Sequence, residues 1–296
     1  MSRHTRTLRE LMRGPELLVA PGVADALNAR LVGRMGFQAV YMTGAGTAAT
    51  RLGRPDIGLL SVTEMVDNAE RIADAASVPL IADADTGYGG VMNVQRTIRA
   101  YERAGVAGVH IEDQVWPKRC GHLDGKAVVP AEEMAAKIRA ACDARHDPDF
   151  VVIARTDALA VEGFERAMDR ARLYEAAGAD MIFIEAPRTL EQLRAIPAAF
   201  GVPTVFNMSA SGKTPFRTAA ELRDMGFRLA IYPNFLLLAG LTAARQVLEE
   251  LRSTGTVEGV AGRMTSFPEF LDLVGLAEVR ESEARYAVAE ELRVGF

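Results

Sequence analysis

Short apolar runs alternate with longer amphipathic stretches along most of the chain. Eight such runs, four to eight residues long, lie at 17–20, 39–44, 79–85, 108–113, 150–157, 181–186, 204–208 and 229–233. The runs are rich in β-branched residues, as is typical of strands buried on both faces, and apolar residues in the stretches between them have helical spacing. This alternation predicts a parallel sheet built from βα units.

Local signals mark where the predicted helices end and begin. Four helical stretches end in a glycine before the next apolar run, at Gly36, Gly105, Gly178 and Gly226. Glycine is common there because a left-handed residue ends a helix. Three helix starts have the spacing of a capping box: Ser61 with Glu64, Thr189 with Gln192, and Thr218 with Glu221.

Eight βα units in roughly 250 residues predict an α/β fold, the (β/α)8 TIM barrel. A doubly wound open sheet is the competing architecture. No linker rich in Pro, Gly or Ser divides the 296 residues, so we expect one barrel domain over 1–296. Residues 255–296 keep a helical pattern beyond the eighth unit. We expect these extra C-terminal helices to pack on the outside of the barrel or to be exchanged between subunits.

Composition narrows the setting of the protein. The net charge is −5 with interleaved signs, which gives no basic stripe for nucleic acid. No apolar run approaches the ~18 residues that a membrane span requires. The first residues lack the apolar core of a signal peptide, and two cysteines cannot make a disulfide framework. We therefore expect a cytoplasmic protein that acts on a small molecule.

Polar residues gather where the predicted strands end. A TIM barrel carries its chemistry at the carboxyl ends of its strands, so these residues are candidates for a site. They are Tyr41, Thr43, Gly44, Asp83, Asp85, Glu112, Asp113, Arg155, Asp157, Glu185 and Asn207. Some of them are expected to be ordinary caps.

The stretch "DADTGYGG" at 83–90 points to a metal ion. Asp83 and Asp85 are separated by one residue, and like charges that close repel unless a cation lies between them. With Glu112 and Asp56 they supply four hard oxygen donors, which suits Mg2+, or Mn2+ as the alternative. An N-cap or salt-bridge role is the structural alternative for Asp85.

The loop "WPKRCGHLDGK" at 116–126 contains one of the two cysteines and one of the four histidines. Cys120 and His122 could be read as a zinc clip, but they supply only two ligands and no second pair follows. Cys142 falls on a predicted helix and is most simply a small buried residue. A polar loop without chemistry is the remaining alternative for 116–126.

The chain resembles the isocitrate lyase and phosphoenolpyruvate mutase superfamily over nearly its whole length. The resemblance rests on "YMTGAG", "DADTGYG", "HIEDQ", "PKRCGH", "ARTDA", "EA" and "NMSASGKTP" in this order. It is closest to the short branch, which holds methylisocitrate lyase, dimethylmalate lyase and carboxyphosphonoenolpyruvate phosphonomutase. The resemblance implies a Mg2+-dependent enzyme and a homotetramer.

The resemblance also implies roles for individual residues. Asp83 would approach Mg2+ most directly, and Asp56, Asp85 and Glu112 would hold its water shell. Thr43, Gly44 and Ala45 would cradle the carboxylate of a pyruvate-like 2-oxo acid, paired with Arg155. The family commonly has Ser in place of Thr43. The other predicted substrate-binding residues are Lys118, Arg119, Gly121, Glu185, Asn207, Ser209 and Ser211.

The implied reaction is a retro-aldol cleavage of a 2-hydroxy di- or tricarboxylate to a 2-oxo acid and a carboxylic acid. Tyr41 is the candidate base, with a strand aromatic that fills the barrel as its alternative. Cys120 is the candidate acid that protonates the carbanion. Lys118, Arg119 and His122 lie near enough in sequence to tune its thiol. Gly121 and Gly125 flank a segment that we expect to be a mobile lid, open without substrate.

The substrate is less well specified than the reaction. The short branch usually has Glu where this chain has Ala210, so Ser209 and Ser211 with Lys213 could bind a second carboxylate, or form an ordinary polar turn. Methylisocitrate- and dimethylmalate-like compounds rank above isocitrate. A P–C bond phosphonomutase and a non-catalytic 2-oxo acid binding protein are the alternative functions.

Overall fold

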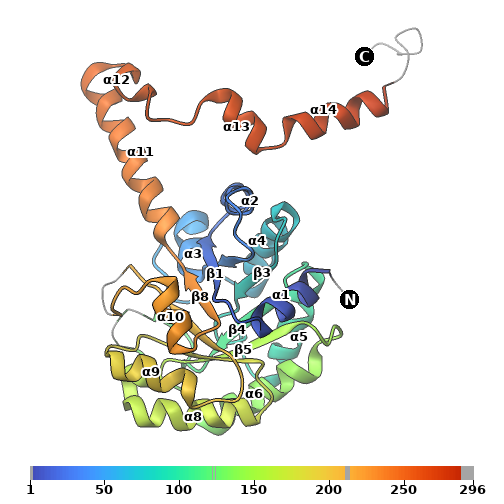
Figure 1. The fold of residues 1–296 in the computed structure, drawn as a ribbon, viewed down its shortest axis with the longest axis vertical. Helices are drawn as coiled ribbons and strands as arrows, with labels where there is room; N and C mark the ends of the chain where they lie inside the picture. The colour runs from blue at the N-terminus through green and yellow to red at the C-terminus, as the bar shows by residue number, and fades with distance from the viewer. Residues whose placement is uncertain (1–2, 122, 124, 211–213, 288–296) are drawn as a thin grey trace. The chain divides into compact units, whose positions relative to one another are not determined.

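The computed structural model describes residues 3–121, 123, 125–210 and 214–287. Its strands form a closed barrel in which each strand pairs in parallel with the next, and β8 pairs with β1 (Figure 1). The strands are β1 (Leu18–Val23), β2 (Val40–Met42), β3 (Leu80–Asp83), β4 (Gly108–Glu112), β5 (Val151–Thr156), β6 (Met181–Ile184), β7 (Thr204–Asn207) and β8 (Leu229–Tyr232). The predicted TIM barrel is confirmed, because an open sheet would leave two strands with an unpaired edge.

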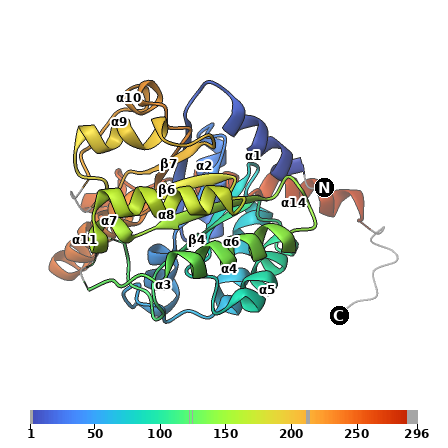
Figure 2. The same cartoon turned by 90° about the horizontal axis from the view of Figure 1, so that it is seen from below.

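Each strand is followed by at least one helix, and the helices of residues 1–239 surround the barrel (Figures 1 and 2). The helices that follow the strands are α2 (Ala26–Arg34), α3 (Gly44–Leu52), α4 (Val62–Ala75), α5 (Val91–Arg103), α6 (Ala131–Ala144), α7 (Ala158–Glu162), α8 (Phe164–Ala176), α9 (Leu190–Ala198), α10 (Ala219–Met225) and α11 (Phe235–Thr254). The four predicted terminal glycines all have φ between 80° and 103°. The three predicted capping boxes are also present. Among the described residues, no helix has both the length and the apolar character needed to cross a bilayer.

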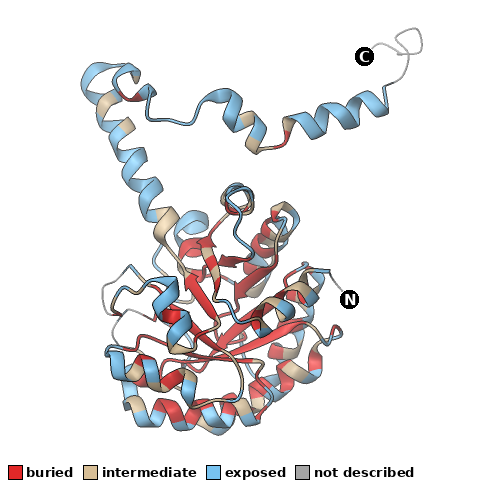
Figure 3. Cartoon of the chain, viewed as in Figure 1, coloured by how far each residue is buried: buried red, intermediate tan, exposed pale blue. Residues whose placement is uncertain are grey.

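The strands are buried on both faces, as their composition predicted (Figure 3). Alternate side chains point into the barrel, where Ile81 and Phe183 belong to one buried apolar cluster. Asp83 and Glu185 lie two residues further along the same strands and therefore point the same way, near the carboxyl ends. Because side chains alternate along a strand, Asp83 and Glu185 point into the barrel at the carboxyl ends of their strands.

A helix that precedes the first strand, α1 (Arg3–Arg13), fills the opposite end of the barrel. Its Leu8 and Met12 are buried in the same cluster as Val151 of β5 and Met181 of β6. Sequence reasoning did not identify this helix. Helix α1 therefore covers the amino-terminal end of the barrel, and the polar candidate residues lie at the other end, where the strands finish.

The chain divides into two compact units, residues 1–239 and 240–296. Helices form in the predicted C-terminal extension, where the described residues contain α12 (Glu258–Ala261), α13 (Phe267–Leu273) and α14 (Leu276–Arg285). No described residue of α11, α13 or α14 is buried. The single domain over 1–296 and the exchange of helices between subunits stay predictions.

Candidate active site

A small cavity of about 40 Å³ lies at the carboxyl ends of the strands. Most of the predicted site residues line it, although they come from strands and loops far apart in the sequence. The lining residues are Tyr41, Thr43, Ala45, Asp56, Asp83, Lys118, Cys120, Gly121, Arg155, Glu185, Asn207, Ser209, Pro233 and Asn234. Pro233 and Asn234 were not predicted. They follow β8, whose carboxyl end has no charged residue to draw attention to it.

Lys118 connects the predicted loop to the acids of the strand ends. Its ammonium lies 2.7 Å from Oδ1 of Asp56 and 2.7 Å from Oδ1 of Asp85, and its side chain is 2% exposed. Burial acts to lower the pKa of Lys118, but the surrounding carboxylates raise it well above its usual value. Lys118 is therefore a fixed positive charge between two predicted metal-binding acids, a position that sequence could not assign.

The two acids of the "DADTG" stretch differ in their ionisation. Burial acts to raise the pKa of Asp83, but His110, Lys118 and Arg155 outweigh it and hold the pKa at about 2. Burial raises the pKa of Asp85 to about 6, and Lys118 opposes this rise. Asp85 also has φ of 47°, in the left-handed region that Asp tolerates better than most residues. Asp83 is thus the permanently ionised carboxylate of the pair.

Arg155 holds a second group of acids together. Its guanidinium lies 3.2 Å from Glu112, 3.0 Å from Asp157 and 3.4 Å from Glu185, and it also stacks over the ring of Phe183. All of these side chains are buried. Burial raises the pKa of Glu112 well above its usual value, and Arg155 opposes the rise. The predicted substrate-pairing arginine is therefore pre-positioned by three carboxylates.

Tyr41 is paired with a histidine that sequence reasoning missed. The Tyr41 hydroxyl lies 2.8 Å from Nε2 of His110, and the two rings stack with centroids 5.7 Å apart. His110 belongs to the quoted "HIEDQ" motif and lies two residues before Glu112, so strand alternation points both into the barrel. That alternation was the signal that could have found it. Burial lowers the pKa of His110 to about 4, which leaves the imidazole neutral at pH 7.

The amino-terminal turn of α3 forms one wall of the cavity. Thr43 is its N-cap, with Oγ1 accepting a hydrogen bond from the Gly46 amide and donating one to Asn234. A Cβ at Gly44 would lie 2.5 Å from Oδ2 of Asp83. Only glycine therefore lets this turn approach the carboxylate so closely. The predicted cradle of Thr43, Gly44 and Ala45 lies beside the principal acid.

The described residues of the 116–126 loop lie in a closed position over the cavity. A Cβ at Gly121 would lie 2.3 Å from Arg155, and the Cys120 amide donates to the backbone oxygen of Asp56. Lys126 bonds Asp157 and the Gly121 carbonyl. Lys118 and Lys126 tie the described part of the loop to buried carboxylates, and the mobile lid stays a prediction.

Comparisons with known proteins agree with this site. A sequence model of the phosphoenolpyruvate phosphomutase family matches residues 8–252. The chain belongs to this family. Among its relatives, 2,3-dimethylmalate lyase of Eubacterium barkeri is 47% identical, over 95% of this chain and 97% of that protein. A 2-methylisocitrate lyase of Aeropyrum pernix is 43% identical, over 99% of this chain and 94% of that protein.

Solved structures of the phosphoenolpyruvate phosphomutase family match the whole fold. Oxaloacetate acetylhydrolase in complex with 3,3-difluorooxalacetate has a TM-score of 0.92 and 41% identity, covering 97% of this chain and 98% of that one. A crystal structure of 2,3-dimethylmalate lyase has a TM-score of 0.91 and 42% identity, with both chains covered fully. The predicted superfamily is confirmed, and so is the prediction that the chain is an enzyme of a group that includes named lyases.

Some predicted site residues do not lie at the cavity. Arg119 is exposed and does not line it, although Gln114 hydrogen-bonds both the amide and the carbonyl of the Arg119 backbone. His122, Ser211 and Lys213 lie outside the described residues. Asp85 and Glu112 stand behind the lining residues, and each is paired with a cation that faces the cavity.

The acids fit a divalent cation held through water. Oε1 of Glu112 is buried and accepts no hydrogen bond from a described residue, and Asp83 stays ionised. Among the described residues, no three Asp, Glu, His or Cys side chains come close enough to ligate one ion directly. This donor set suits Mg2+, which keeps several waters, and does not suit a closed zinc site.

Lys118→Met should destabilise the protein because it leaves two buried carboxylates without their cation. Removing one partner of a buried ion pair costs about 3–5 kcal/mol. Lys137→Met is the matched control, since Lys137 is also buried but lies 3.7 Å from Glu133 and 3.5 Å from the Thr86 carbonyl. Urea denaturation should show a loss of less than about 1 kcal/mol for this control.

The loss in Lys118→Met should depend on pH. Without Lys118 the pKa of Asp85 rises above about 6, so Asp85 is protonated at pH 5 and must ionise without compensation at pH 8. Because a raised folded-state pKa of an acid destabilises the protein as pH increases, the deficit should be larger at pH 8. An equal deficit at both pH values would show that Lys118 does not compensate Asp85.

Proposed function

We propose that this protein is a Mg2+-dependent carbon–carbon lyase. It cleaves a 2-hydroxy di- or tricarboxylate, of the methylisocitrate or dimethylmalate type, to pyruvate and a carboxylic acid. One observation carries the proposal: a single cavity is lined by an ionised carboxylate for a metal, an arginine for a carboxylate, a phenol and a thiol. These are the groups that a retro-aldol cleavage followed by protonation of a carbanion requires.

The metal would be held by Asp83, Asp85, Asp56 and Glu112, mainly through water, with Mn2+ as an alternative to Mg2+. A bound divalent cation would act as a Lewis acid at the oxygen of C2. Asp83 supplies the charge for this, because its pKa of about 2 keeps it ionised at any physiological pH. Lys118 already neutralises Asp56 and Asp85, so the net charge of the site stays moderate.

The carboxylate of the 2-oxo acid half would lie against the amino-terminal turn of α3. Backbone amides of Gly44 and Ala45 are hydrogen-bond donors there, at the positive end of a nine-residue helix. The Thr43 hydroxyl donates to Asn234 in this structure and would have to turn toward the substrate to join them. Arg155 supplies the opposite charge. Its carboxylate neighbours fix the guanidinium, so little side-chain entropy remains to be lost on binding.

The far end of the substrate would meet Glu185, Asn207 and Ser209. The Asn207 amide donates to Glu185 at 3.1 Å, so these two side chains orient each other. Ala210 leaves this end without the usual family acid. A second carboxylate of the substrate is therefore tolerated here, and we propose that Ser209, together with Ser211 and Lys213, receives it.

Tyr41 and His110 together can remove the proton of the C2 hydroxyl. Burial raises the pKa of Tyr41 well above its usual value, so the phenol is protonated and is a weak base alone. Nε2 of the neutral imidazole lies 2.8 Å from the phenol oxygen and can accept the phenol hydrogen bond, which would direct the lone pairs of the phenol oxygen toward the substrate hydroxyl. This contact supports Tyr41 as the proposed base and gives His110 a role as the residue that positions the Tyr41 hydroxyl.

Cys120 is the proposed acid that protonates the departing carbanion. It lines the same cavity as Asp83, Tyr41 and Arg155. The loop that contains Cys120 is held by the ion pair between Lys118 and Asp56 and by the hydrogen bond that the Cys120 amide donates to the Asp56 carbonyl. The contacts that hold this loop over the cavity therefore also place the Cys120 thiol there. His122 stays a proposed contributor to the tuning of this thiol.

We also propose a cytoplasmic homotetramer in which the C-terminal helices are exchanged. The exposed large apolar side chains of residues 240–296 support this proposal. They include Leu248, Leu251, Phe267 and Phe270. Helices of this composition gain stability by covering such residues. Both cysteines are free thiols, which agrees with a reducing compartment.

A phosphonomutase is the second candidate function. A chloroplastic carboxyvinyl-carboxyphosphonate phosphorylmutase of Arabidopsis thaliana is 44% identical over 92% of this chain and 81% of that protein. The Tyr41–His110 pair favours the lyase, because transfer of a phosphoryl group between oxygen and carbon does not need a base for a substrate hydroxyl.

Product analysis distinguishes these functions. The protein with Mg2+ should release pyruvate from 2-methylisocitrate or 2,3-dimethylmalate, and it should not convert a phosphonopyruvate to phosphoenolpyruvate, as a phosphonomutase would. Oxaloacetate and isocitrate complete the panel, and chelation with EDTA should stop the reaction. Absence of any 2-oxo acid from the hydroxy acids would exclude the lyase.

Cys120→Ser should lower kcat by about 10²–10⁴-fold, the usual contribution of a general acid. Binding of pyruvate, followed by calorimetry, should stay within a few-fold because the metal and carboxylate contacts remain. Cys142→Ser is the control and should keep full activity. Its thiol bonds the Gly178 carbonyl, and burial raises its pKa to about 11. Parallel loss of binding and turnover would mean that Cys120 is a structural residue.

A further inference from the structure

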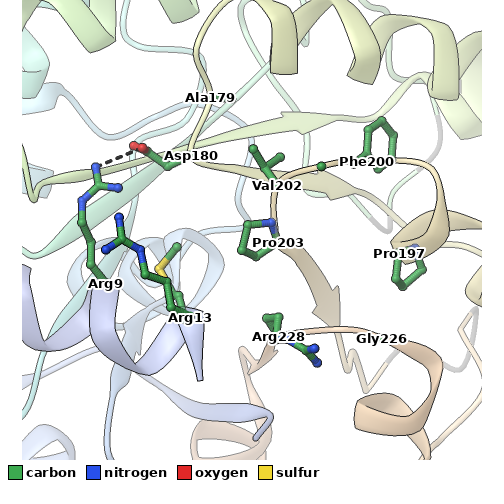
Figure 4. Close-up of a pocket in the computed structure, with 12 residues that line it drawn as sticks. Arg9, Arg13, Ala179, Asp180, Pro197, Phe200, Val202, Pro203, Gly226 and Arg228 are labelled. Carbon is green, nitrogen blue, oxygen red and sulfur yellow. Dashed lines mark ion pairs between the residues drawn. The ribbon is translucent and has the colours of Figure 1, made fainter. Parts of the chain in front are cut away.

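A second and larger pocket lies at the opposite end of the barrel from the candidate active site. Its volume is about 550 Å³, within the range of small-molecule sites. It is formed by α1 and by the turns that lead into β6, β7 and β8 (Figure 4). The lining residues are Arg9, Met12, Arg13, Ala179, Asp180, Pro197, Phe200, Gly201, Val202, Pro203, Gly226 and Arg228.

Three arginines and only one acid line this pocket. The acid, Asp180, is already used: it lies 3.0 Å from Arg9 and 2.6 Å from Arg145, and it accepts the Val152 amide at 2.9 Å. Asp180 is therefore shared between two guanidinium groups, and Arg9 also lies 3.7 Å from Asp149. The lining carries a formal excess of two positive charges in a chain whose net charge is −5.

The excess charge lies on Arg13 and Arg228. Within the described part of the chain, neither forms an ion pair with a carboxylate, and Arg228 donates only to the carbonyl of the neighbouring Phe227. Arg155 and Arg170, by contrast, each pair with buried or half-buried acids. Guanidinium groups with free donors are the side chains best suited to carboxylates and phosphates.

Helix ends explain one of these arginines but not both. Arg13 lies in the last turn of α1, where a cation is favoured by the helix dipole. Arg228 lies between α10 and β8. The end of α10 is already capped by the Gly226 amide, which donates to the Arg223 backbone carbonyl. Arg228 is half-buried and forms no ion pair with a described residue, which leaves guanidinium donors for a bound anion.

The remainder of the lining is apolar. Figure 4 shows Arg9 and Arg13 extending from α1 on one side, with Val202, Pro203 and Arg228 on the other. Phe200 and Pro197 continue the apolar wall. An inorganic ion would use only the guanidinium groups, whereas a ligand with a carbon skeleton would also cover this wall.

We propose that this pocket binds a small organic anion, a carboxylate or phosphate monoester, with Arg228 as its principal cation and the exposed Arg13 at the rim. The anionic group takes the free donors of Arg228, and the carbon skeleton packs on Val202, Pro203 and Phe200. Arg9 stays paired with Asp180 and fixes the α1 side. The site is independent of the proposed function, because none of its lining residues belongs to the candidate active site.

Calorimetry with succinate, glycerol 3-phosphate and inorganic phosphate tests this proposal. Three proteins are compared: the wild type, Arg13→Ala/Arg228→Ala, and the control Arg96→Ala/Arg103→Ala. The control removes the same charge from exposed positions on α5. Succinate or glycerol 3-phosphate should bind the wild type and the control equally, and the pocket variant at least tenfold more weakly.

Two results would overturn the proposal. Equal binding by all three proteins, or no saturable binding, would show that the two arginines form no site. Inorganic phosphate binding as tightly as both organic anions would show that charge alone acts and that the apolar wall has no part. If succinate binds at the candidate active site instead, the Arg13→Ala/Arg228→Ala variant will bind it as tightly as the wild type does.

Discussion

The site depends on how several carboxylates are kept buried in one barrel mouth. Asp83, Asp85, Glu112 and Glu185 are each at most 4% exposed. Carboxylates taken out of water are stable only when cations and hydrogen bonds replace the lost hydration. Lys118 and Arg155 supply those cations. The candidate active site is therefore an arrangement of two buried cations that hold the acids in place.

This requirement links the loop to the chemistry. Lys118 is two residues from Cys120, so the ion pairs that neutralise Asp56 and Asp85 also place the thiol over the cavity. Arg155 faces the same cavity from the strands and is the proposed partner of the substrate carboxylate. The neutralisation of buried acids by Lys118 and Arg155 thus links the proposed metal-binding acids, the position of the loop and the proposed proton donor.

The sequence predicted what depends on local pattern. β-branched runs predicted the strands, Gly226 and the capping box at Thr218 were confirmed, and the polar strand ends predicted the acids. Contacts set by tertiary structure were missed: the partner of Tyr41, the Asn234 bond to Thr43, and the α1 helix that fills the barrel. Arg119 was assigned to the site from the resemblance and its nearness to Cys120, yet its side chain is exposed and does not line the cavity.

The central claim is that the buried acids form a cation site whose principal charge is Asp83. Titration of the purified protein with Mg2+ by calorimetry, in the presence of oxalate as a 2-oxo acid analogue, tests it most directly. The account predicts one Mg2+ per chain, lost in Asp83→Asn and retained in Asp149→Asn, whose side chain lies at the far end of the barrel near Arg9. Binding that survives Asp83→Asn unchanged, or no binding by the wild type, would contradict it.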